Sequence, residues 1–265
     1  MGKKIILIKI GGSLITDKQK PFTLRKQALE KICNEIHLAQ KTGKLLILGH
    51  GGGSFPHFPA KKYQTHLGIK DASSYKGIAE VADAAARLNR IVVQTLLKKG
   101  VNALSISPSS IFVSKNFVKD SLCTESVEQA LQLGLLPVVY GDVILDREKG
   151  CTIYSTERVL GYIGLVLQKH GYTIEKIIHC GQTNGVYDDN GNTIPFINSK
   201  KIDALRHCLG GSGGVDVTGG MIHKVEESLE LAKQGIPGLI IDGIEHGSLS
   251  QAIAGIEVLG TRIEK

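Results

Sequence analysis

The sequence of 265 residues has few of the aromatic side chains on which nucleic-acid binding depends: no tryptophan, seven tyrosines and six phenylalanines. Bases stack on such rings, and basic residues that bind nucleic acid usually gather in a patch or stripe. Here the lysines and arginines are spread along the chain. The net charge of +7 still favours anionic partners. We therefore expect a small phosphorylated molecule as the partner, and no nucleic acid.

The sequence also lacks the patterns of a secreted, metal-binding or membrane protein. Its five cysteines are widely separated and form no Cys-x-x-Cys pair, which argues against a disulfide framework and a zinc site. No apolar run reaches the roughly 18 residues that a membrane-spanning helix needs. The basic start and the apolar residues 5–10 resemble a signal peptide only superficially, because the stretch is short, contains Lys9 and has no cleavage site. We expect a cytoplasmic protein with free thiols, no membrane partner and no metal-ligand cluster.

Apolar, strand-like runs alternate with longer helical periods along the chain. This alternation predicts an α/β fold with a mainly parallel sheet and helices on both of its faces. The expected strands are Lys4–Lys9, Leu45–Gly49, Ala103–Ser107, Pro137–Tyr140, Lys176–Cys180 and Gly238–Asp242. The expected helices are Leu24–Lys41, capped by Thr23, and Ala72–Lys99, Glu125–Leu133, Arg158–Lys169, Ser199–Leu209 and Met221–Gln234. Turns at residues 141–142 and 148–150 predict a small antiparallel excursion. Because no linker divides the chain, we expect one domain over residues 1–265.

Three glycine-rich turns are the main clue to function. Residues 9–13 (KIGGS) and residues 50–57 (HGGGSFPH) each follow directly on a strand-like run. Glycines at a strand end allow a ligand to approach the backbone closely, and consecutive amides can form an anion nest. Residues 216–224 (DVTGGMIHK) lead into a helix, whose positive end favours an anion.

None of these turns has the Walker A spacing, and no G-x-G-x-x-G fingerprint follows the first strand. The P-loop and Rossmann interpretations are therefore excluded. Three separate turns, together with Lys9, Lys18 and Lys224, still indicate a polyphosphate ligand. Phosphoryl transfer needs mainly positioning and charge neutralisation, which lysines and backbone amides supply.

As a set, these motifs resemble the amino acid kinase superfamily and, within it, the isopentenyl phosphate kinases. The resemblance runs from Lys4 to Ile263. Its carriers are KIGGS at residues 9–13, TDK at 16–18, HGGGSFPH at 50–57, SISPSS at 105–110, PVVYGD at 137–142, and DVTGGM at 216–221 with Lys224. The second histidine of the glycine turn, His57, is shared with isopentenyl phosphate kinases and fosfomycin kinases, and generally not with kinases that act on carboxylates.

The resemblance implies an open three-layer αβα sandwich with two lobes, residues 1–170 binding the phosphate acceptor and residues 171–265 binding ATP. The implied reaction is the phosphorylation of isopentenyl phosphate by ATP to isopentenyl diphosphate, with Mg²⁺ screening the ATP charges, in a homodimer. Lys9, Lys18 and His57 would be catalytic, and Asp142 would order one of the two lysines. The implied acceptor-binding residues are Gly52, Gly53, His57 and Thr156. The implied ATP-binding residues are Lys9, Gly11, Gly12, Ser13, Gly53, Gly219, Gly220 and Lys224. An apolar slot for the prenyl tail is expected along Ala72–Lys99, at Tyr75, Ile78 and Val81, or along Ile106–Phe112.

The chain departs from the family pattern in three places, and these departures leave two alternatives open. Pro56 stands where the family usually has glycine, and residues 155–158 (STER) replace Ser-Gly-Asp-Asp. These changes lie on the acceptor side and leave open a kinase for another phosphate or phosphonate, such as fosfomycin. Residues 181–187 (GQTNGVY) lack the two carboxylates of Thr-Asp-Val-Asp-Gly-Val-Tyr. That loss leaves open a nucleotide-binding regulator without catalysis.

Overall fold

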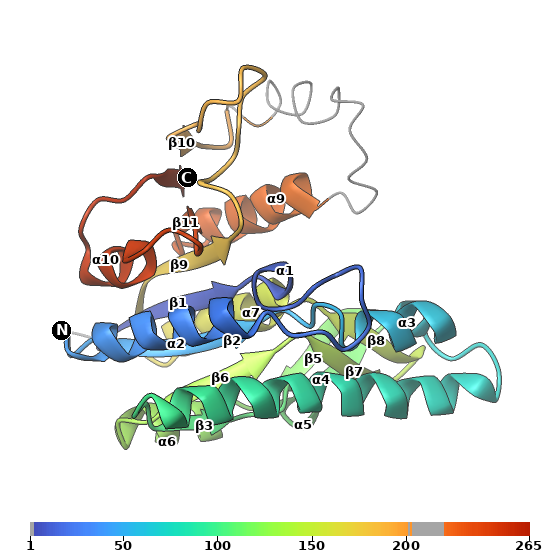
Figure 1. Ribbon diagram of the computed structural model, residues 1–265. Helices are drawn as coiled ribbons and strands as arrows, with labels where there is room; N and C mark the ends of the chain where they lie inside the picture. The colour runs from blue at the N-terminus through green and yellow to red at the C-terminus, as the bar shows by residue number, and fades with distance from the viewer. Residues whose placement is uncertain (1–2, 201, 203–219) are drawn as a thin grey trace.

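The computed structural model describes residues 3–200, 202 and 220–265, and its centre is an eight-stranded sheet with the order β10-β12-β11-β9-β1-β2-β6-β3. All neighbouring strands in this sheet run parallel except β11 and β12. Figure 1 shows the C-terminal strands at one end of the sheet and β2, β6 and β3 at the other. The strands are β1 (Lys4–Ile10), β2 (Leu45–His50), β3 (Ala103–Ser105), β6 (Leu136–Tyr140), β9 (Thr173–Gly181), β10 (Phe196–Ile197), β11 (Gly238–Asp242) and β12 (Gly260–Ile263).

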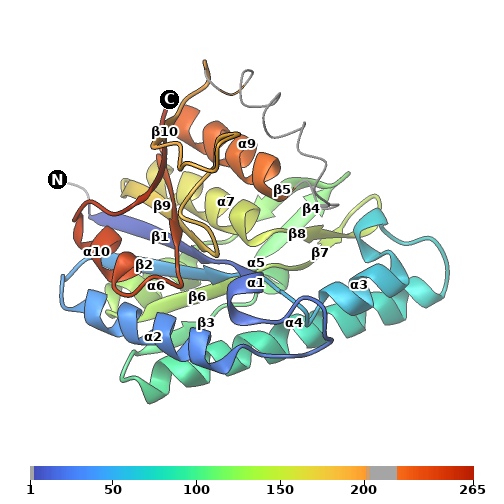
Figure 2. The same cartoon turned by 45° about the horizontal axis from the view of Figure 1, so that its top comes forward.

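Helices cover both faces of this sheet, as the alternation of the sequence predicts. Along β1, Ile6 and Ile8 pack against one helical layer, and Ile5 and Leu7 pack against the other, all fully buried. Figure 2 shows α2 and α4 on the near side of the sheet and α7 and α9 on the far side. The first layer contains α2 (Lys26–Gln40), α4 (Ser73–Lys98) and α10 (Ser248–Ala254), and the second contains α6 (Glu125–Gln132), α7 (Thr156–Lys169) and α9 (Gly220–Lys233). The predicted αβα sandwich is therefore confirmed. Of the helices that the structure describes, none combines the length and the apolar character needed to cross a membrane.

The predicted strands and the long helices are all present within a few residues of their expected bounds. The expected cap of the first helix is wrong: α2 begins at Lys26, and its N-cap residue is Arg25. The Thr23 hydroxyl instead donates to the carbonyl of Pro21. The helix expected at residues 199–209 lies almost entirely outside the described residues.

The sequence pattern did not predict the shorter elements. Each is too short to show a clear period of its own. They are α1 (Gly12–Ile15), α3 (His57–Tyr63), η1 (Thr65–Leu67), α5 (Pro108–Ile111), α10 (Ser248–Ala254), β4 (Phe112–Lys115), β5 (Val118–Leu122), the edge strand β10 and its neighbour β12.

A second, four-stranded sheet with the order β5-β4-β7-β8 lies beside the main one. Strands β7 (Asp142–Asp146) and β8 (Gly150–Tyr154) form an antiparallel hairpin, which confirms the predicted antiparallel excursion. Half of this sheet, the hairpin β4–β5, was not predicted.

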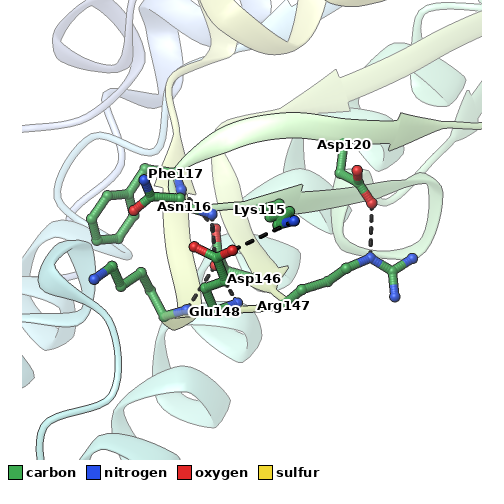
Figure 3. Close-up of polar contacts among 8 residues, drawn as sticks. Lys115, Asn116, Phe117, Asp120, Asp146, Arg147 and Glu148 are labelled. Carbon is green, nitrogen blue, oxygen red and sulfur yellow. Dashed lines mark hydrogen bonds and ion pairs between the residues drawn. The ribbon is translucent and has the colours of Figure 1, made fainter.

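Asp146, at the end of β7, joins the turns of these two hairpins (Figure 3). Its buried carboxylate accepts the amides of Asn116 at 3.1 Å and Phe117 at 2.8 Å, in the β4–β5 turn. It also accepts the amides of Glu148 at 2.9 Å and Lys149 at 2.8 Å, in its own turn. Burial raises its pKa, but these donors together lower it well below the ordinary value. One ionised carboxylate thus fixes the mutual position of two turns.

We expect Asp146→Asn to destabilise the protein by about 1–3 kcal/mol, because buried N–H donors lose a charged acceptor. A depressed carboxyl pKa stabilises the folded state above the ordinary pKa, and this stabilisation is lost as the pH falls toward the folded-state value. The difference between wild type and variant should therefore shrink below about pH 4. Urea unfolding at neutral and acid pH measures both effects.

The matched control is Asp120→Asn, since Asp120 pairs at 2.8 Å with Arg147 on the exposed side of the same sheet (Figure 3). An exposed ion pair contributes only about 0–1 kcal/mol. Equal losses of stability in the two variants would contradict the role given to Asp146.

Glu35 ties α2 to α10 in a similar way. Its buried carboxylate accepts the amides of Gly247 and Leu249 at 3.0 Å and that of Ser250 at 3.2 Å. At the other end of α10, the Lys176 ammonium donates to the Ala252 carbonyl at 2.7 Å. An acid at the N-terminus and a base at the C-terminus both stabilise a helix, so this short C-terminal helix is held against the sheet from both ends.

Candidate active site

The first two glycine turns lie side by side because β1 and β2 are parallel neighbours. Ile10 and His50, the last residues of these strands, are register partners. The Gly51 amide donates to the Ile10 carbonyl at 2.9 Å, and the Gly11 amide donates to the carbonyl of Cys180 on β9 at 2.8 Å. Ligands of open α/β sheets bind at the carboxyl ends of the strands, and both turns lie there.

The two turns are in backbone-to-backbone contact, and only glycine permits this. A Cβ atom on Gly12 would lie 2.4 Å from the Gly53 nitrogen, and one on Gly51 would lie 2.7 Å from the Gly12 nitrogen. Gly53 also has a φ of +53°, in the left-handed region that glycine adopts without cost. The run of glycines in the sequence therefore reflects a close approach of two main chains.

This contact leaves a group of backbone amides available to a ligand. In the described part of the chain, no group accepts a hydrogen bond from the amides of Gly12, Ser13, Gly52 or Gly53. Neighbouring N–H groups of this kind form a concave site for anions. The geometry thus supports the predicted phosphate-binding role of both turns.

Thr16 connects the turns through its fully buried hydroxyl. The Thr16 hydroxyl donates to the Gly12 carbonyl at 2.8 Å and accepts the Ser54 amide at 3.0 Å. We expect Thr16→Val, which keeps the shape and removes the hydroxyl, to cost about 1–3 kcal/mol of stability. Because the amides would then be less well positioned, KM for the phosphate ligands should rise. Thr16→Ser keeps the bridge and is the control: a serine variant as impaired as the valine variant would argue against it.

A buried polar network lies beneath the second turn. The ring of His50 is fully buried, and its two nitrogens lie 3.2 Å from the Gly51 carbonyl and 3.1 Å from the Asn89 amide nitrogen on α4. The Asn89 carbonyl in turn accepts the Ser105 hydroxyl. Burial lowers the pKa of His50 to about 4, so the ring is neutral at neutral pH. His50 therefore links the glycine turn to α4 without adding charge to the site.

Lys9 is buried at the end of β1 and pairs with Glu157, whose carboxylate oxygen lies 2.6 Å from the Lys9 ammonium. Glu157 lies in the first turn of α7. Burial raises the pKa of this carboxyl, but the charge of Lys9, the nearby His179 and the hydrogen bonds to the carboxylate together lower the pKa to about 2. The pair places the Lys9 ammonium beside an ionised carboxylate at the carboxyl end of β1.

Asp142 was expected to order either Lys9 or Lys18, and among the described residues its hydrogen bonds go to Ser107, Ser109 and Val143. Its carboxylate accepts the amides of Val143 at 2.8 Å and Ser109 at 3.3 Å. It is the Glu157 carboxylate that orders Lys9, and sequence reasoning had treated this residue only as part of a departure from the family pattern. The sequence offered one signal for Glu157: this acid lies in the first turn of a helix that Ser155 caps.

His57 begins α3, the short helix that follows the second glycine turn. His57 is exposed, yet partial desolvation of the ring lowers its pKa, and the nearby charge of Lys18 lowers it further. The structure therefore brings together His57 and Lys18, which are 39 positions apart in the sequence. A neutral histidine with one N–H beside a lysine suits the binding of a phosphate.

Thr156 turns its side chain into the protein rather than toward a ligand. Its hydroxyl donates to the His50 carbonyl at 2.8 Å, and its methyl group packs against Gly49. What remains for an acceptor phosphate is the main chain at the N-terminus of α7, a helix of 14 residues. The Thr156 side chain is therefore turned away from the acceptor phosphate, and we expect the predicted contact at this residue to be made by its backbone N–H.

The third glycine turn is described only from Gly220 onward, and Gly219 lies outside the described residues. Gly220 begins α9, and Lys224 follows in its first turns. The charge of Lys224 acts on the buried ring of His179, the β9 neighbour of Lys9. The start of α9 therefore approaches Lys9 from the side of β9.

Comparison with known proteins places this site in a family. Residues 4–242 match the amino acid kinase family. The chain is 32% identical to the isopentenyl phosphate kinases of Methanocaldococcus jannaschii and of Methanothermobacter thermautotrophicus, in each case over 98% of both chains. Among solved structures, an isopentenyl phosphate kinase superposes with a TM-score of 0.83 at 28% identity, covering 98% of this chain and 99% of the other.

Proposed function

The chain belongs to the amino acid kinase family, and we propose that it transfers the terminal phosphoryl group of ATP to isopentenyl phosphate, giving ADP and isopentenyl diphosphate for isoprenoid biosynthesis. The observation that carries this is the pair of interlocked glycine turns, the first of which directly follows the strand that holds Lys9. The full-length similarity to isopentenyl phosphate kinases supports the same acceptor.

For this phosphoryl transfer the protein must position the two substrates and supply positive charge. The acceptor phosphate is already an anionic nucleophile at neutral pH, so no general base is needed. His57 and the amides of Gly52 and Gly53 hold that phosphate in line with the ATP. Lys9 neutralises charge on the transferring group, and Lys18 assists beside His57.

The ATP phosphates are held by the first and third glycine turns, at Gly11, Gly12, Ser13 and Gly220, with Lys224 as a further cation. Among the described residues, no three histidine, cysteine, aspartate or glutamate side chains group as metal ligands do. We propose that Mg²⁺ is carried mainly by the ATP phosphates and screens their charge. We propose that residues 1–170 form the acceptor lobe and residues 171–265 the ATP lobe.

The prenyl tail is best accommodated by an apolar cluster between α3, α4 and the β7–β8 hairpin. Val81, Val143 and Cys151 form its buried base, and half-buried Ile78 and Ile153 line it. Of the expected slot residues, Ile78 fits this role, Val81 belongs to the base, and Tyr75 is 64% exposed. Ile106 and Phe112 belong instead to the core beneath α6 and α7. The hairpin residues Val143 and Ile153 were not expected from the sequence.

We further propose a cytoplasmic homodimer. Cys33, Cys151 and Cys180 are buried free thiols, as is usual in a reducing compartment. The edge strand β3 exposes Leu104, and the end of the adjacent α4 exposes Leu97. Light scattering should give twice the chain mass, and Leu104→Lys should shift the protein toward the monomer.

The proposed activity is tested by ADP release from ATP and Mg²⁺, with isopentenyl phosphate, fosfomycin or no acceptor. Strong turnover with isopentenyl phosphate alone is the expected result. Turnover with fosfomycin instead would move the acceptor to a phosphonate. ATP binding without transfer to either acceptor would contradict the proposed activity.

A further inference from the structure

His179 is a buried histidine that the proposed chemistry does not use. It lies on β9 directly beside Lys9, its register partner on β1, and it is only 3% exposed. Ile177, two residues earlier on the same face of β9, lies in the apolar core beneath α7. An imidazole ring in this layer costs desolvation energy unless its polar atoms have partners.

The two ring nitrogens of His179 differ in this respect. Nε2 lies 3.0 Å from the hydroxyl oxygen of Ser228 on α9, whereas Nδ1 is buried and has no hydrogen-bond partner in the described part of the chain. Ser228 is itself fully buried, and this is the one hydrogen bond that the structure gives its hydroxyl. Among the hydrogen bonds of the described residues no other acceptor stands against this hydroxyl, so its proton is best placed toward Nε2. The neutral ring then carries its own proton on Nδ1.

Three charged groups from three elements act electrostatically on this ring: Lys9 of β1, Glu157 of α7 and Lys224 of α9. Burial lowers the pKa of His179 to about 4; Glu157 acts to raise it, and the two lysines act to lower it. The ring is accordingly neutral at neutral pH. Of the three groups, only the Glu157 carboxylate can accept a hydrogen bond.

The Lys9–Glu157 pair raises a difficulty for the proposed reaction. The Lys9 ammonium lies 2.6 Å from the Glu157 carboxylate, yet it must also serve the transferring phosphoryl group. A buried carboxylate that loses its partner is strongly destabilised. That cost would oppose the movement of Lys9 unless another donor replaced it at Glu157.

We infer that His179 is a positioning residue whose Nδ1–H becomes the hydrogen-bond donor to Glu157 when Lys9 turns from this carboxylate to the phosphates. The inference rests on the proposed kinase activity and deepens it. His179 touches neither substrate. It acts by keeping Glu157 satisfied, which allows Lys9 to leave its resting position.

Two substitutions separate this role from a structural one. The side-chain amide of His179→Asn lies near the place of Nδ1, and that of His179→Gln lies near the place of Nε2. We expect His179→Gln to lower kcat by about 10-fold or more, since a misplaced catalytic group costs up to about 10²-fold, with little change in either KM. His179→Asn should keep most of kcat although it loses the contact with Ser228. A larger loss of kcat in His179→Asn than in His179→Gln, or equal losses in the two variants, would overturn the inference.

Ser228→Ala is the matched control, because it removes the link to α9 and leaves Nδ1 in place. The kcat of Ser228→Ala should stay near that of the wild type. A loss of kcat as large as that of His179→Gln would show that the hydrogen bond between His179 and Ser228, and not Nδ1, is responsible, and would overturn the inference. A readout without turnover is the nitrogen-15 spectrum of the wild-type ring at neutral pH. The Nδ1–H tautomer is expected, and the Nε2–H tautomer would overturn the inference. Inactivity of the wild type toward isopentenyl phosphate would instead count against the proposed function.

Discussion

Lys9→Met should lower kcat for phosphoryl transfer by about 10³-fold, the loss typical of removing one preorganised charge-stabilising donor. Lys9 is the buried cation at the junction of the two glycine turns. The same change should also destabilise the fold by about 3–5 kcal/mol, because it leaves the Glu157 carboxylate buried without a counter-charge, which the neutral His179 ring does not supply. Steady-state kinetics and denaturant unfolding measure the two effects separately.

The double variant Lys9→Met/Glu157→Gln distinguishes catalysis from stability. With both charges removed, the site is neutral, and most of the lost stability should return. The activity should not return, since no cation replaces Lys9 at the transferring group. A double variant that recovers kcat along with its stability would show that Lys9 acts only by preserving the fold.

The residues that sequence reasoning placed correctly share one property: their positions follow from local pattern. The glycine turns stand at the ends of apolar runs, and parallel pairing of β1 with β2 brings them together. No additional information is needed once a parallel sheet is predicted, because all carboxyl ends of its strands lie at one edge. This is why the position of the first two glycine turns at one edge of the sheet could be predicted, whereas their direct contact at Gly12 and Gly53 could not.

The residues that were missed depend on contacts between distant segments. Glu35 lies in an amphipathic helix, where an acid normally faces water, yet it is buried because the amides of α10 reach it from more than 200 positions away. Glu157 and His179 likewise gain their roles only when α7 and α9 pack on the face that carries Lys9. The sequence pattern alone contains no signal that polar side chains from separate helices and strands will come into contact in the core.

His57→Ala should lower kcat/KM for isopentenyl phosphate by about 10²-fold, while KM for ATP stays nearly unchanged. A loss of this size is usual when a hydrogen-bond donor to the developing charge is removed. His57 is placed for this at the start of α3, directly after the second glycine turn and close to Lys18. His66 lies in the next turn of chain and is exposed, so His66→Ala is the control and should leave both constants unaltered.

His57→Gln distinguishes whether the neutral or the protonated ring of His57 is the active form. Partial desolvation and the charge of Lys18 hold the pKa of the exposed His57 ring below its ordinary value of 6.5, so the ring at neutral pH is an uncharged donor. An uncharged amide can provide the same kind of hydrogen bond, and His57→Gln should retain a substantial part of the activity that His57→Ala loses. If glutamine were as damaging as alanine, and wild-type activity rose as the pH fell toward 6, the imidazolium would be the active form. The lowered pKa argues for the neutral ring, because Lys18 already supplies the positive charge and a second one beside it would be repelled.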